Sequence, residues 1–527
     1  MDNRSGLFIA DSNTFNITAA QLSTLLNRGM YINVHSALYP GGEIRGQILG
    51  MAQTVFRAHL AGSHEIPMVY STGHGMVMAE LNDTTLTLSG TFSDLTGSFN
   101  GGSHIHLGIA GRSGGVVRPV FVNAASDLKS GELRIADNTI PLTPAQVSSM
   151  MSRMYYLNIH TDIYTGGEIR GQMVPLAMAY FYAYTGGAQE APPVNSWATG
   201  AFLAEMQGDM VTVSGSFDNL SSTYTASHIH TGAPGISGPV LQALNVILDA
   251  DSMGGTYSYT TNKPTFGAAD KTSLRNRMLY VNIHSDEYPR GEIRGQLMME
   301  ATMYFASLLS GESENPPANT TATGTIMSEV TGRKLVITGS FTGLSSAINT
   351  PGSAHLHRGM AGENGGVKIG LTPTINADTK SGSFDAATNT YNITDGFVDS
   401  LLGRMVYANV HTASFPGGEI RGQMLPLANM YYTARLSGIN EVSPVVSNGM
   451  GAVKVEVNGT RMTVTGSFSG LESEFNGGAH LHLGATGING GVVLPLKVNA
   501  STDMLSGHLM ADSNVYQLST LSEAHQE

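Results

Sequence analysis

One eighteen-residue pattern occurs four times and limits how the chain can fold. It reads YINVHSALYPGGEIRGQI at 31–48, YLNIHTDIYTGGEIRGQM at 156–173, YVNIHSDEYPRGEIRGQL at 280–297 and YANVHTASFPGGEIRGQM at 407–424. Its histidine recurs at intervals of 125, 124 and 127 residues, which is the length of a domain and too long for a solenoid repeat. The chain of 527 residues is therefore a tandem array of domains.

Other segments recur at the same interval and define the limits of each repeat. Every repeat opens with an alternating segment and a turn, as in AHLAGSHEIPMV, and ends with GEIRGQ. No linker rich in Pro or Ser separates the repeats, so we expect a stiff rod or curved string of domains. The segments are an N-terminal half-repeat (1–50, a closing half), repeat 1 (51–176), repeat 2 (177–300), repeat 3 (301–427) and a C-terminal half-repeat (428–527, an opening half).

The residues between these landmarks favour β-structure. Runs such as TLTLSGTF (85–92) are rich in Thr and alternate with a period of two, which is typical of half-buried antiparallel strands. The helical signal is short, since Thr18 with Gln21, and Thr143 with Gln146, match the capping box at a helix start. We therefore predict a mostly β protein of tandem antiparallel β-sandwich domains (Ig-like, Greek-key), each with one short helix.

Composition excludes several classes of function. Charged residues make up 13% of the chain, the net charge is −13, and no basic stripe is present that could neutralise a phosphate backbone. The apolar run MVPLAMAYFYAY (173–184) is shorter than the roughly 20 residues that span a bilayer. The chain has no cysteine, so disulfides and thiolate metal sites cannot form. We expect no nucleic-acid partner and no membrane span.

A second histidine motif lies in every opening half. It reads GSHIHLG at 102–108, ASHIHTG at 226–232, SAHLHRG at 353–359 and GAHLHLG at 478–484. Residues i and i+2 of a strand point to the same face, so each His-x-His segment presents two imidazoles together. The histidine of the Asn-x-His segment can then supply a third ligand.

Three neutral imidazoles suit copper or zinc, and three protein ligands leave one position open for water or another ligand. We therefore predict one copper or zinc ion per repeat, with a slight preference for copper. The alternative hypothesis is that these histidines are structural and hydrogen-bond to the glycine-rich loop that follows. The predicted ligand sets are His104, His106 and His160; His228, His230 and His284; His355, His357 and His411; and, divided between the half-repeats, His480, His482 and His35.

The GEIRGQ segment supplies a glutamate and an arginine two residues apart, such as Glu292 and Arg294, which share a strand face. A structural salt bridge or hydrogen bonds to a histidine would explain this pair, and we favour the salt bridge. Glu65, Glu190, Glu314 and Glu441 in the opening turns are further candidate partners of the arginines.

Together these segments resemble the CHRD domain, a family named from chordin and found in many bacterial extracellular proteins. The resemblance rests on GGAQEAPPVNSWATG (186–200), the His-x-His loop and the GEIRGQ ending, and it covers essentially the whole chain. It implies an extracellular β-rich domain and supplies no agreed enzymatic activity. Chordin's antagonism of growth factors is not transferred, because its cysteine-rich modules are absent here. We expect the protein to be extracellular or on the cell surface.

The half-repeats lead to an expectation about assembly. Half a sandwich exposes unpaired strand edges and an apolar face, so it needs a partner. A second copy of the chain can supply it, because its N-terminal half-repeat can dock on a C-terminal half-repeat by strand addition. The result is a head-to-tail homo-oligomer or polymer. The competing explanation is that the chain was cut from a longer array, which would make its ends accidental.

Both ends also carry a version of one strand. SGLFIADSN (5–13) recurs as SGHLMADSN (506–514), and only one of them can occupy its place in a repeat. The capping box follows only the N-terminal copy, so we expect that copy to take the place and the other to be displaced.

The leading hypothesis is an extracellular structural protein, the subunit of a filament or surface assembly, with a metal site in each repeat. We do not expect an enzyme, because no Ser-His-Asp arrangement, nucleotide loop or pair of catalytic carboxylates recurs with the repeats. Two alternatives stay open. One is a copper or zinc enzyme with redox or hydrolytic chemistry at the open position, and the other is a multivalent adhesive array that binds a surface or matrix ligand.

Overall fold

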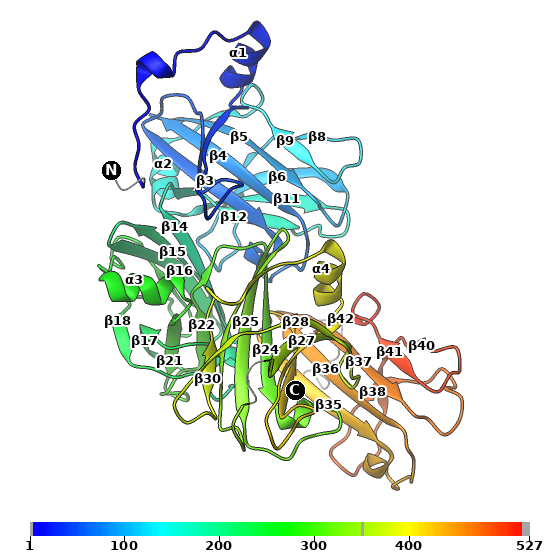
Figure 1. Cartoon of the computed structure of the whole chain (residues 1–527). Coiled ribbons are helices and arrows are strands. Elements are labelled where there is room, and N and C mark those ends of the chain that lie inside the picture. The colour runs from blue at the N-terminus through cyan, green and yellow to red at the C-terminus, as the bar shows by residue number, and fades with distance from the viewer. Residues whose placement is uncertain (1–3, 349–351, 519–527) are drawn as a thin grey trace.

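The computed structural model describes residues 4–348 and 352–518 as a series of antiparallel sheets (Figure 1). Strands form 44% of the protein and helices 9%. These proportions and the sheet pairing confirm the predicted class of tandem antiparallel β-sandwich repeats.

Repeat 1 is a sandwich built from one continuous sheet of eleven strands. The strand order is β7-β6-β11-β12-β3-β4-β5-β9-β8, with β10 beside β5 and β13 beside β3. Phe56 and Leu88 from one layer meet Ile105 and Leu157 from the other layer in a single core, because alternate strand residues face inward. The strands are β3 (Thr54–Ala61), β4 (His74–Asn82), β5 (Thr85–Ser93), β6 (Phe99–Leu107), β7 (Val116–Pro119), β8 (Asn123–Ala124), β9 (Gly131–Leu133), β10 (Thr139–Pro141), β11 (Tyr155–Thr161), β12 (Ile169–Gln172) and β13 (Val174–Pro175).

Repeat 2 has the same order divided into two sheets, β18-β17-β21-β22 and β19-β20-β16-β15-β14-β23. The two sheets meet at a bridge between Gly186 and Arg294. The strands are β14 (Ala179–Thr185), β15 (Thr199–Gln207), β16 (Met210–Asp218), β17 (Tyr224–Thr231), β18 (Val240–Ala243), β19 (Ile247–Leu248), β20 (Gly255–Tyr257), β21 (Leu279–Ser285), β22 (Ile293–Gln296) and β23 (Met298–Met299).

Repeat 3 again forms one sheet, in the order β28-β27-β32-β33-β24-β25-β26-β30-β29, with β31 beside β26 and β34 beside β24. Its strands are β24 (Met303–Ser310), β25 (Thr323–Thr331), β26 (Lys334–Thr342), β27 (Ala354–Arg358), β28 (Val367–Gly370), β29 (Pro373–Ile375), β30 (Gly382–Phe384), β31 (Thr390–Asn392), β32 (Val406–Val410), β33 (Ile420–Gln423) and β34 (Leu425–Pro426).

One short helix lies in each closing half, as predicted. The two predicted capping boxes are present, since the hydroxyl of Thr18 accepts the backbone N–H of Gln21 at 3.2 Å and that of Thr143 accepts the N–H of Gln146 at 3.3 Å. The helices are α1 (Ala19–Leu26), α2 (Pro144–Met151), α3 (Ala268–Arg275) and α4 (Asp395–Leu402).

The two half-repeats contain complementary parts of the strand order. In the N-terminal half-repeat, β1 (Tyr31–Val34) and β2 (Ile44–Gln47) pair only with each other among the described strands. The C-terminal half-repeat has a sheet in the order β35-β36-β37-β41-β40, with β42 beside β37, and a separate pair β38-β39. Its strands are β35 (Met430–Ser437), β36 (Met450–Asn458), β37 (Arg461–Ser469), β38 (His480–His482), β39 (Val492–Pro495), β40 (Asn499–Ala500), β41 (Gly507–Leu509) and β42 (Val515–Gln517).

The prediction for the duplicated strand is wrong, because the C-terminal copy takes the place in the repeat. β41 pairs with β37 as β9 pairs with β5 in repeat 1. Residues 5–13 form no strand, and Leu7 and Phe8 are 90% and 74% exposed. The physical reason is proximity along the chain, since β41 begins within 40 residues of the end of β37, whereas the N-terminal copy is more than 440 residues away and closing that loop costs more entropy.

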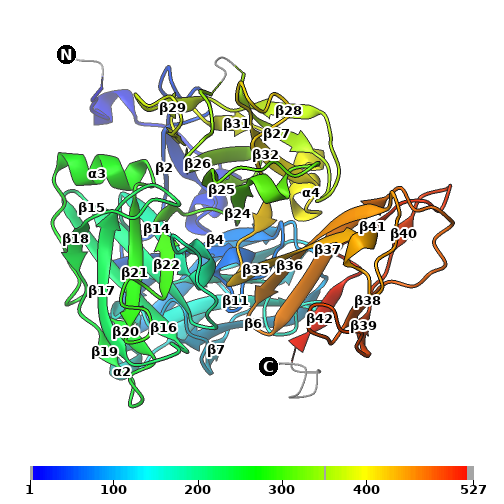
Figure 2. The ribbon, with the colours of Figure 1, turned by 90° about the horizontal axis from the view of Figure 1, so that it is seen from below.

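The repeats wrap around a shared core instead of forming the expected rod or string (Figure 2). Repeat 1 contacts the C-terminal half-repeat directly, where the Asn458 side chain donates to the carbonyl of Met68 at 3.1 Å. One cluster of buried side chains draws on every repeat, and it includes Val174, Tyr180, Tyr182, Tyr184, Tyr304 and Leu427, with Tyr431 packed against it. Strand periodicity indicates which face of a strand is buried, and it does not indicate which repeat covers that face.

Each unit is attached to the next by an arginine–glutamate ion pair. An arginine just after the helix, in a left-handed backbone conformation, reaches a glutamate 52 residues later on the next unit. The N-terminal half-repeat is therefore docked on repeat 1 in the same way as the repeats are docked on each other. The N–O distances are 2.7 Å for Arg28–Glu80, 2.9 Å for Arg153–Glu205, 2.5 Å for Arg277–Glu329 and 2.9 Å for Arg404–Glu456.

We predict that Glu205→Ala destabilises the protein by about 3–5 kcal/mol, because it leaves the buried guanidinium of Arg153 without its counter-ion. The side chains of this pair are 10% and 6% exposed. Glu132→Ala is the control, since it removes an ion pair with Arg134 in which both side chains are 49% exposed, and it should change stability little. Denaturant unfolding followed by circular dichroism measures both effects, and equal losses would contradict the prediction.

Candidate metal centre

In each complete repeat the two histidine motifs lie on neighbouring strands. In repeat 1, β6 carries His104 and His106, β11 carries His160, and His104 is paired with Asn158. The three imidazoles therefore project from one side of the sheet. One ring nitrogen from each comes within 4.8 Å of the other two, and the same holds for His228, His230 and His284 and for His355, His357 and His411.

Backbone carbonyls orient two of the three rings. His106 Nδ1 donates to the carbonyl of Gly114 at 2.9 Å, and His160 Nδ1 donates to the carbonyl of Thr165 at 2.9 Å. A carbonyl oxygen can only accept, so both rings carry their proton on Nδ1 and present the lone pair of Nε2. His104 Nδ1 lies 3.3 Å from His160 Nε2, so the three nitrogens converge.

Repeats 2 and 3 reproduce this geometry. His230 and His357 each donate from Nδ1 to a backbone carbonyl at 2.9 Å, and His284 and His411 do so at 3.2 and 3.1 Å. His228 Nδ1 lies 3.2 Å from His284 Nε2. Three independent copies of one arrangement indicate that the fold builds it in each repeat.

Five of the converging nitrogens have no hydrogen-bond partner among the described residues. In the described part of the chain, the Nε2 atoms of His106, His230, His357 and His411 and the Nδ1 atom of His355 are buried and form no hydrogen bond. Buried polar atoms without a partner are uncommon in folded proteins. A purely structural role explains the Nδ1 atoms that donate to loop carbonyls. It does not explain why the Nε2 atoms of the same rings are buried without a partner.

Burial keeps these imidazoles neutral. It lowers the pKa of His106, His160 and His357, and it lowers the pKa of His284 to about 4. The neutral ring is the form that binds a metal, so protons compete weakly for these nitrogens near neutral pH.

A layer of aromatic and guanidinium groups lies behind each site. The His106 ring stacks on Tyr156, with centroids 5.0 Å apart and planes inclined by 11°. The guanidinium carbon of Arg170 lies 3.5 Å from the centroid of Tyr156. Arg170 Nη2 donates to the carbonyls of Ile109 and Arg112 at 3.2 and 2.9 Å. The arginine of GEIRGQ therefore positions the loop that follows the His-x-His motif.

The favoured salt bridge within GEIRGQ is wrong. Glu168 is fully buried and accepts the hydroxyl of Ser71 at 2.5 Å and the backbone N–H groups of Thr96 and Gly97 at 2.6 and 2.9 Å. Among the described residues, the guanidinium of Arg170 donates instead to the carbonyls of Ile109 and Arg112 and to the amide oxygen of Gln172. Several neutral donors satisfy a buried carboxylate without a cation, and sequence spacing does not reveal them.

The glutamates of the opening turns lie near the arginines without forming simple counter-ions. Burial raises the pKa of Glu65 and Glu190 to about 8 and that of Glu314 to about 7, although the nearby arginines oppose the shift. Burial therefore favours the neutral, protonated form of these carboxyl groups.

The fourth predicted ligand set is not brought together within one chain. His480 and His482 in β38 have ring centroids 5.7 Å apart, close to the spacing in the complete repeats. His35 directly follows β1 in the N-terminal half-repeat, and that half-repeat lies far from β38 in both views (Figures 1 and 2). Nevertheless, His482 Nδ1 and His35 Nδ1 each donate to a loop carbonyl, at 3.0 and 2.9 Å, as their counterparts do.

One group of possible ligands was not predicted. His59 and His64 of repeat 1 lie with Glu300, at the connection between repeats 2 and 3, so that one donor atom of each is within 4.8 Å of the others. No recurring motif marks these residues, because the equivalent positions in the other repeats hold different residue types. That departure is the only signal of the cluster in the sequence.

Comparison with known proteins identifies the family. The CHRD domain family matches residues 2–48, 56–173, 181–297, 305–424 and 432–525, and the curated proteins give no match. Domains of this family are typically extracellular. Across the described residues, no helix has the length and apolar character needed to cross a membrane. The chain belongs to the CHRD domain family, as a tandem array of five matched segments.

Proposed function

We propose that this protein is an extracellular structural subunit that polymerises head to tail by completing a split repeat, and that each repeat binds a copper or zinc ion through three histidines. Copper is slightly preferred. The assembly would lie at the cell surface or in the surrounding matrix.

The observation that carries this proposal is a gap in the strand order of the C-terminal half-repeat. In repeat 1, β11 and β12 lie between the His-x-His strand β6 and the first strand β3. In the C-terminal half-repeat, β38 is the counterpart of β6 and β35 is the counterpart of β3. These two strands belong to separate sheets, with no described strand between them. The counterparts of β11 and β12 are β1 and β2, an isolated pair at the other end of the chain. Inserting β1 and β2 between β38 and β35 gives the order of a complete repeat.

The complete repeats also supply the register of this junction. In repeat 1, Asn158 pairs with His104, and Arg170 pairs with Ala61. The equivalent pairs between two copies are Asn33 with His480, and Arg45 with Ser437.

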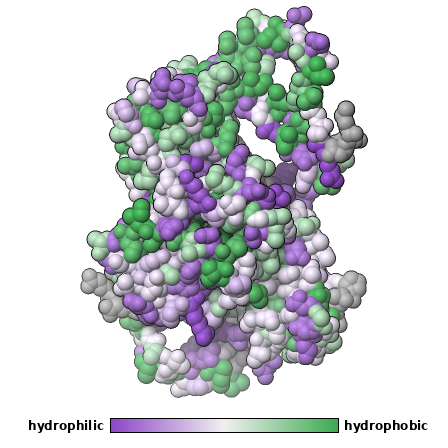
Figure 3. Space-filling view, turned by 90° about the vertical axis from the view of Figure 1, so that its left-hand side faces the viewer, coloured by the Kyte–Doolittle hydropathy of each residue, from purple (hydrophilic) through white to green (hydrophobic). Residues whose placement is uncertain are grey.

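Apolar exposure in the N-terminal half-repeat supports docking. Ile32 and Ile44 are 50% and 65% exposed, whereas their counterparts Leu157 and Ile169 are fully buried. Figure 3 displays hydrophobic surface at the top of the molecule, where Figure 1 places α1 and the N-terminal segment. Removing apolar surface from water stabilises by about 25 cal/mol per Å², so covering this face favours association.

Polar groups of the same half-repeat match the proposed partner. Arg45 already lies over Tyr31, with its guanidinium carbon 3.3 Å from the ring centroid, as in the complete repeats. It is exposed to solvent, whereas Arg170 is 2% exposed and donates to the loop after His-x-His. In the C-terminal half-repeat the equivalent acceptor is the carbonyl of Ala485.

Docking in this register would also complete a fourth histidine site. His35 would meet His480 and His482 in the way that His160 meets its two partners. The ion pair between Arg28 and Glu80 already joins the N-terminal half-repeat to repeat 1, as the equivalent pairs join consecutive repeats. The completed repeat would therefore be followed by repeat 1 in the same way as one internal repeat is followed by the next.

A structural role is preferred to that of a copper or zinc enzyme. The same three-histidine geometry recurs in every complete repeat, and a scaffold uses identical sites in every unit, whereas catalysis seldom needs several copies on one chain.

We predict that His230→Ala lowers the copper or zinc content of the purified protein by one ion per chain, because it removes one of three ligands. His74→Ala, which changes a histidine outside the predicted sites, is the control. Since burial lowers the pKa of His228, His230 and His284, the wild-type protein should keep the metal of this site from pH 8 down to about pH 6. Mass spectrometry of the metals provides the measurement, and an unchanged content would support the structural alternative.

We predict that Ile44→Asp prevents polymerisation, because it places a carboxylate at a position that is fully buried in each complete repeat. Leu38→Asp is the matched control, since Leu38 lies in a loop and its counterpart Ile163 remains 60% exposed in repeat 1. Electron microscopy and light scattering should detect polymers of the control and only single chains of Ile44→Asp. Deleting residues 1–50 should act like Ile44→Asp, and filaments that survive either change would refute strand completion.

We predict a smaller effect for His35→Ala, which leaves the apolar contact intact. It should weaken assembly only to the extent that metal stabilises the junction, and a chelator should reduce wild-type assembly by the same amount. Sedimentation velocity with and without chelator measures this, and a chelator effect that persists in His35→Ala would exclude metal at the junction.

A further inference from the structure

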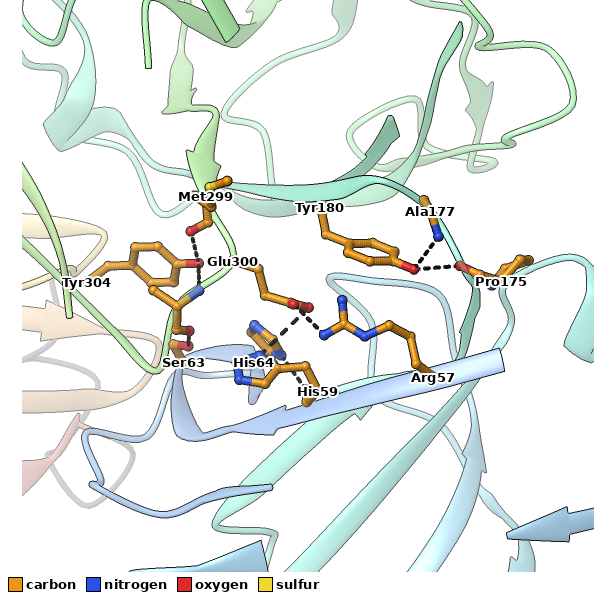
Figure 4. A network of polar contacts seen from close by, with 11 residues as sticks. Arg57, His59, Ser63, His64, Pro175, Ala177, Tyr180, Met299, Glu300 and Tyr304 are labelled. Atoms are coloured by element: carbon orange, nitrogen blue, oxygen red, sulfur yellow. Dashed lines mark hydrogen bonds and ion pairs between the residues drawn. The ribbon is translucent and has the colours of Figure 1, made fainter. Parts of the chain in front are cut away.

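A different type of ligand cluster lies where repeat 1 meets the connection between repeats 2 and 3 (Figure 4). His59 belongs to β3, and His64 follows in the short 3-10 helix η2 (Gly62–His64). Glu300 extends toward these imidazoles from the neighbouring connection. One donor atom from each of the three residues lies within 4.8 Å of the other two.

Two donor nitrogens of this cluster have no other partner. His64 Nδ1 donates to the carbonyl of His59 at 3.0 Å, so its Nε2 presents a lone pair. This Nε2 atom and His59 Nδ1 are buried and form no hydrogen bond within the described residues. His59 Nδ1 lies 3.7 Å from Glu300 Oε1, which is too far for a hydrogen bond. Two unsatisfied nitrogens are thus buried beside a carboxylate.

His64 has one ring nitrogen more than its structural hydrogen bond requires. The same contact with the carbonyl five residues earlier is made by the amide of Gln189 in repeat 2, at 2.5 Å, and by that of Asn440 in the C-terminal half-repeat, at 3.2 Å. A single N–H donor is enough for this contact. The imidazole makes it and adds a second nitrogen, while stacking on Tyr182 with centroids 4.2 Å apart holds the ring in place.

Glu300 stands where the repeats otherwise have an apolar residue. The equivalent positions hold Leu176 and Leu427, and Leu427 is buried in the core between repeats. Arg57 donates to Oε2 of Glu300 at 2.5 Å, which leaves Oε1 on the side of His59. A carboxylate here is therefore not required by the repeat fold, and one of its oxygens is available as a ligand.

We propose that His59, His64 and Glu300 bind one divalent transition-metal ion, of which zinc fits best, and that this ion cross-links repeat 1 to the connection between repeats 2 and 3. Two imidazole nitrogens and one carboxylate oxygen are a ligand set that zinc accepts, at about 2 Å from each atom. Around one tetrahedral ion these donors are roughly 3–3.5 Å apart, so small side-chain rotations close the cluster. Arg57 stays on the second carboxylate oxygen and orients the carboxylate. This site depends neither on the three-histidine sites nor on assembly.

The test uses replacements that the chain itself carries at equivalent positions. His64→Gln copies Gln189 and keeps the structural donor, so it should fold. Glu300→Leu alone would leave Arg57 without its counter-ion, so the second variant combines Arg57→Ala with Glu300→Leu, which copies Ala306 and Leu427 of repeat 3. Each full-length variant is loaded with Zn²⁺, separated from excess ion by gel filtration and analysed for zinc. We expect each to hold one zinc ion per chain fewer than the wild type. The result is a difference, so it does not depend on how many ions the three-histidine sites hold.

His74→Ala is the matched control, because His74 lies on the neighbouring strand outside the cluster and is paired with Asp94 at 3.6 Å. It should keep the wild-type zinc content. Zinc should also raise the thermal midpoint of the wild type and of His74→Ala more than that of His64→Gln, whereas the midpoints should agree in excess chelator. Equal zinc contents of the wild type and His64→Gln would overturn the proposal, as would loss of an ion from His74→Ala.

Discussion

A buried guanidinium group holds each complete repeat together. Arg170, Arg294 and Arg421 are at most 2% exposed, and each lies over a tyrosine ring and donates to carbonyls of the loop after His-x-His. Burying a guanidinium cation without carbonyl acceptors for its N–H groups would be very unfavourable. The closing strand, the loop and the tyrosine must therefore be in place together. The same tyrosine stacks on a site histidine, so one ring contacts both the buried arginine and the histidine site.

This dependence explains why strand residues and the arginine that are buried in the complete repeats are exposed in the N-terminal half-repeat. The N-terminal half-repeat carries the arginine and the tyrosine, and the C-terminal half-repeat carries the loop that would receive them. Each half already has its local geometry, including the tyrosine–arginine contact and the histidine–carbonyl hydrogen bonds. What each half lacks is the set of strands that covers the equivalent surface in a complete repeat.

The contacts between units are as regular as those within them. A hydroxyl on the third strand of one unit donates to a loop carbonyl of the preceding unit, from Ser216 to Ala110, Ser340 to Pro234 and Ser467 to Ala361, always over 106 residues. Together with the arginine–glutamate pairs, these contacts fix the rotation from each unit to the next. The result is a tightly wound array with a common aromatic core, in which residues of non-adjacent units come into contact. The cluster of His59, His64 and Glu300 exists only because of that winding.

The sequence by itself determined the parts of this protein that depend on local pattern and repetition. Period-two alternation, the His-x-His and Asn-x-His spacing and the Thr–Gln capping pairs predicted the strands, the converging histidines and the helix starts, since each depends on residues a few positions apart or on strand pairing repeated in every unit. The tertiary structure decided the rest. Glu168 is satisfied by neutral donors about 70 to 100 residues away and not by Arg170, the C-terminal copy of the duplicated strand occupies its place, and the units wind around one core. Glu300 meets His59 across 241 residues because the winding brings their surfaces together, and side-chain packing between units, which no local pattern records, sets that winding.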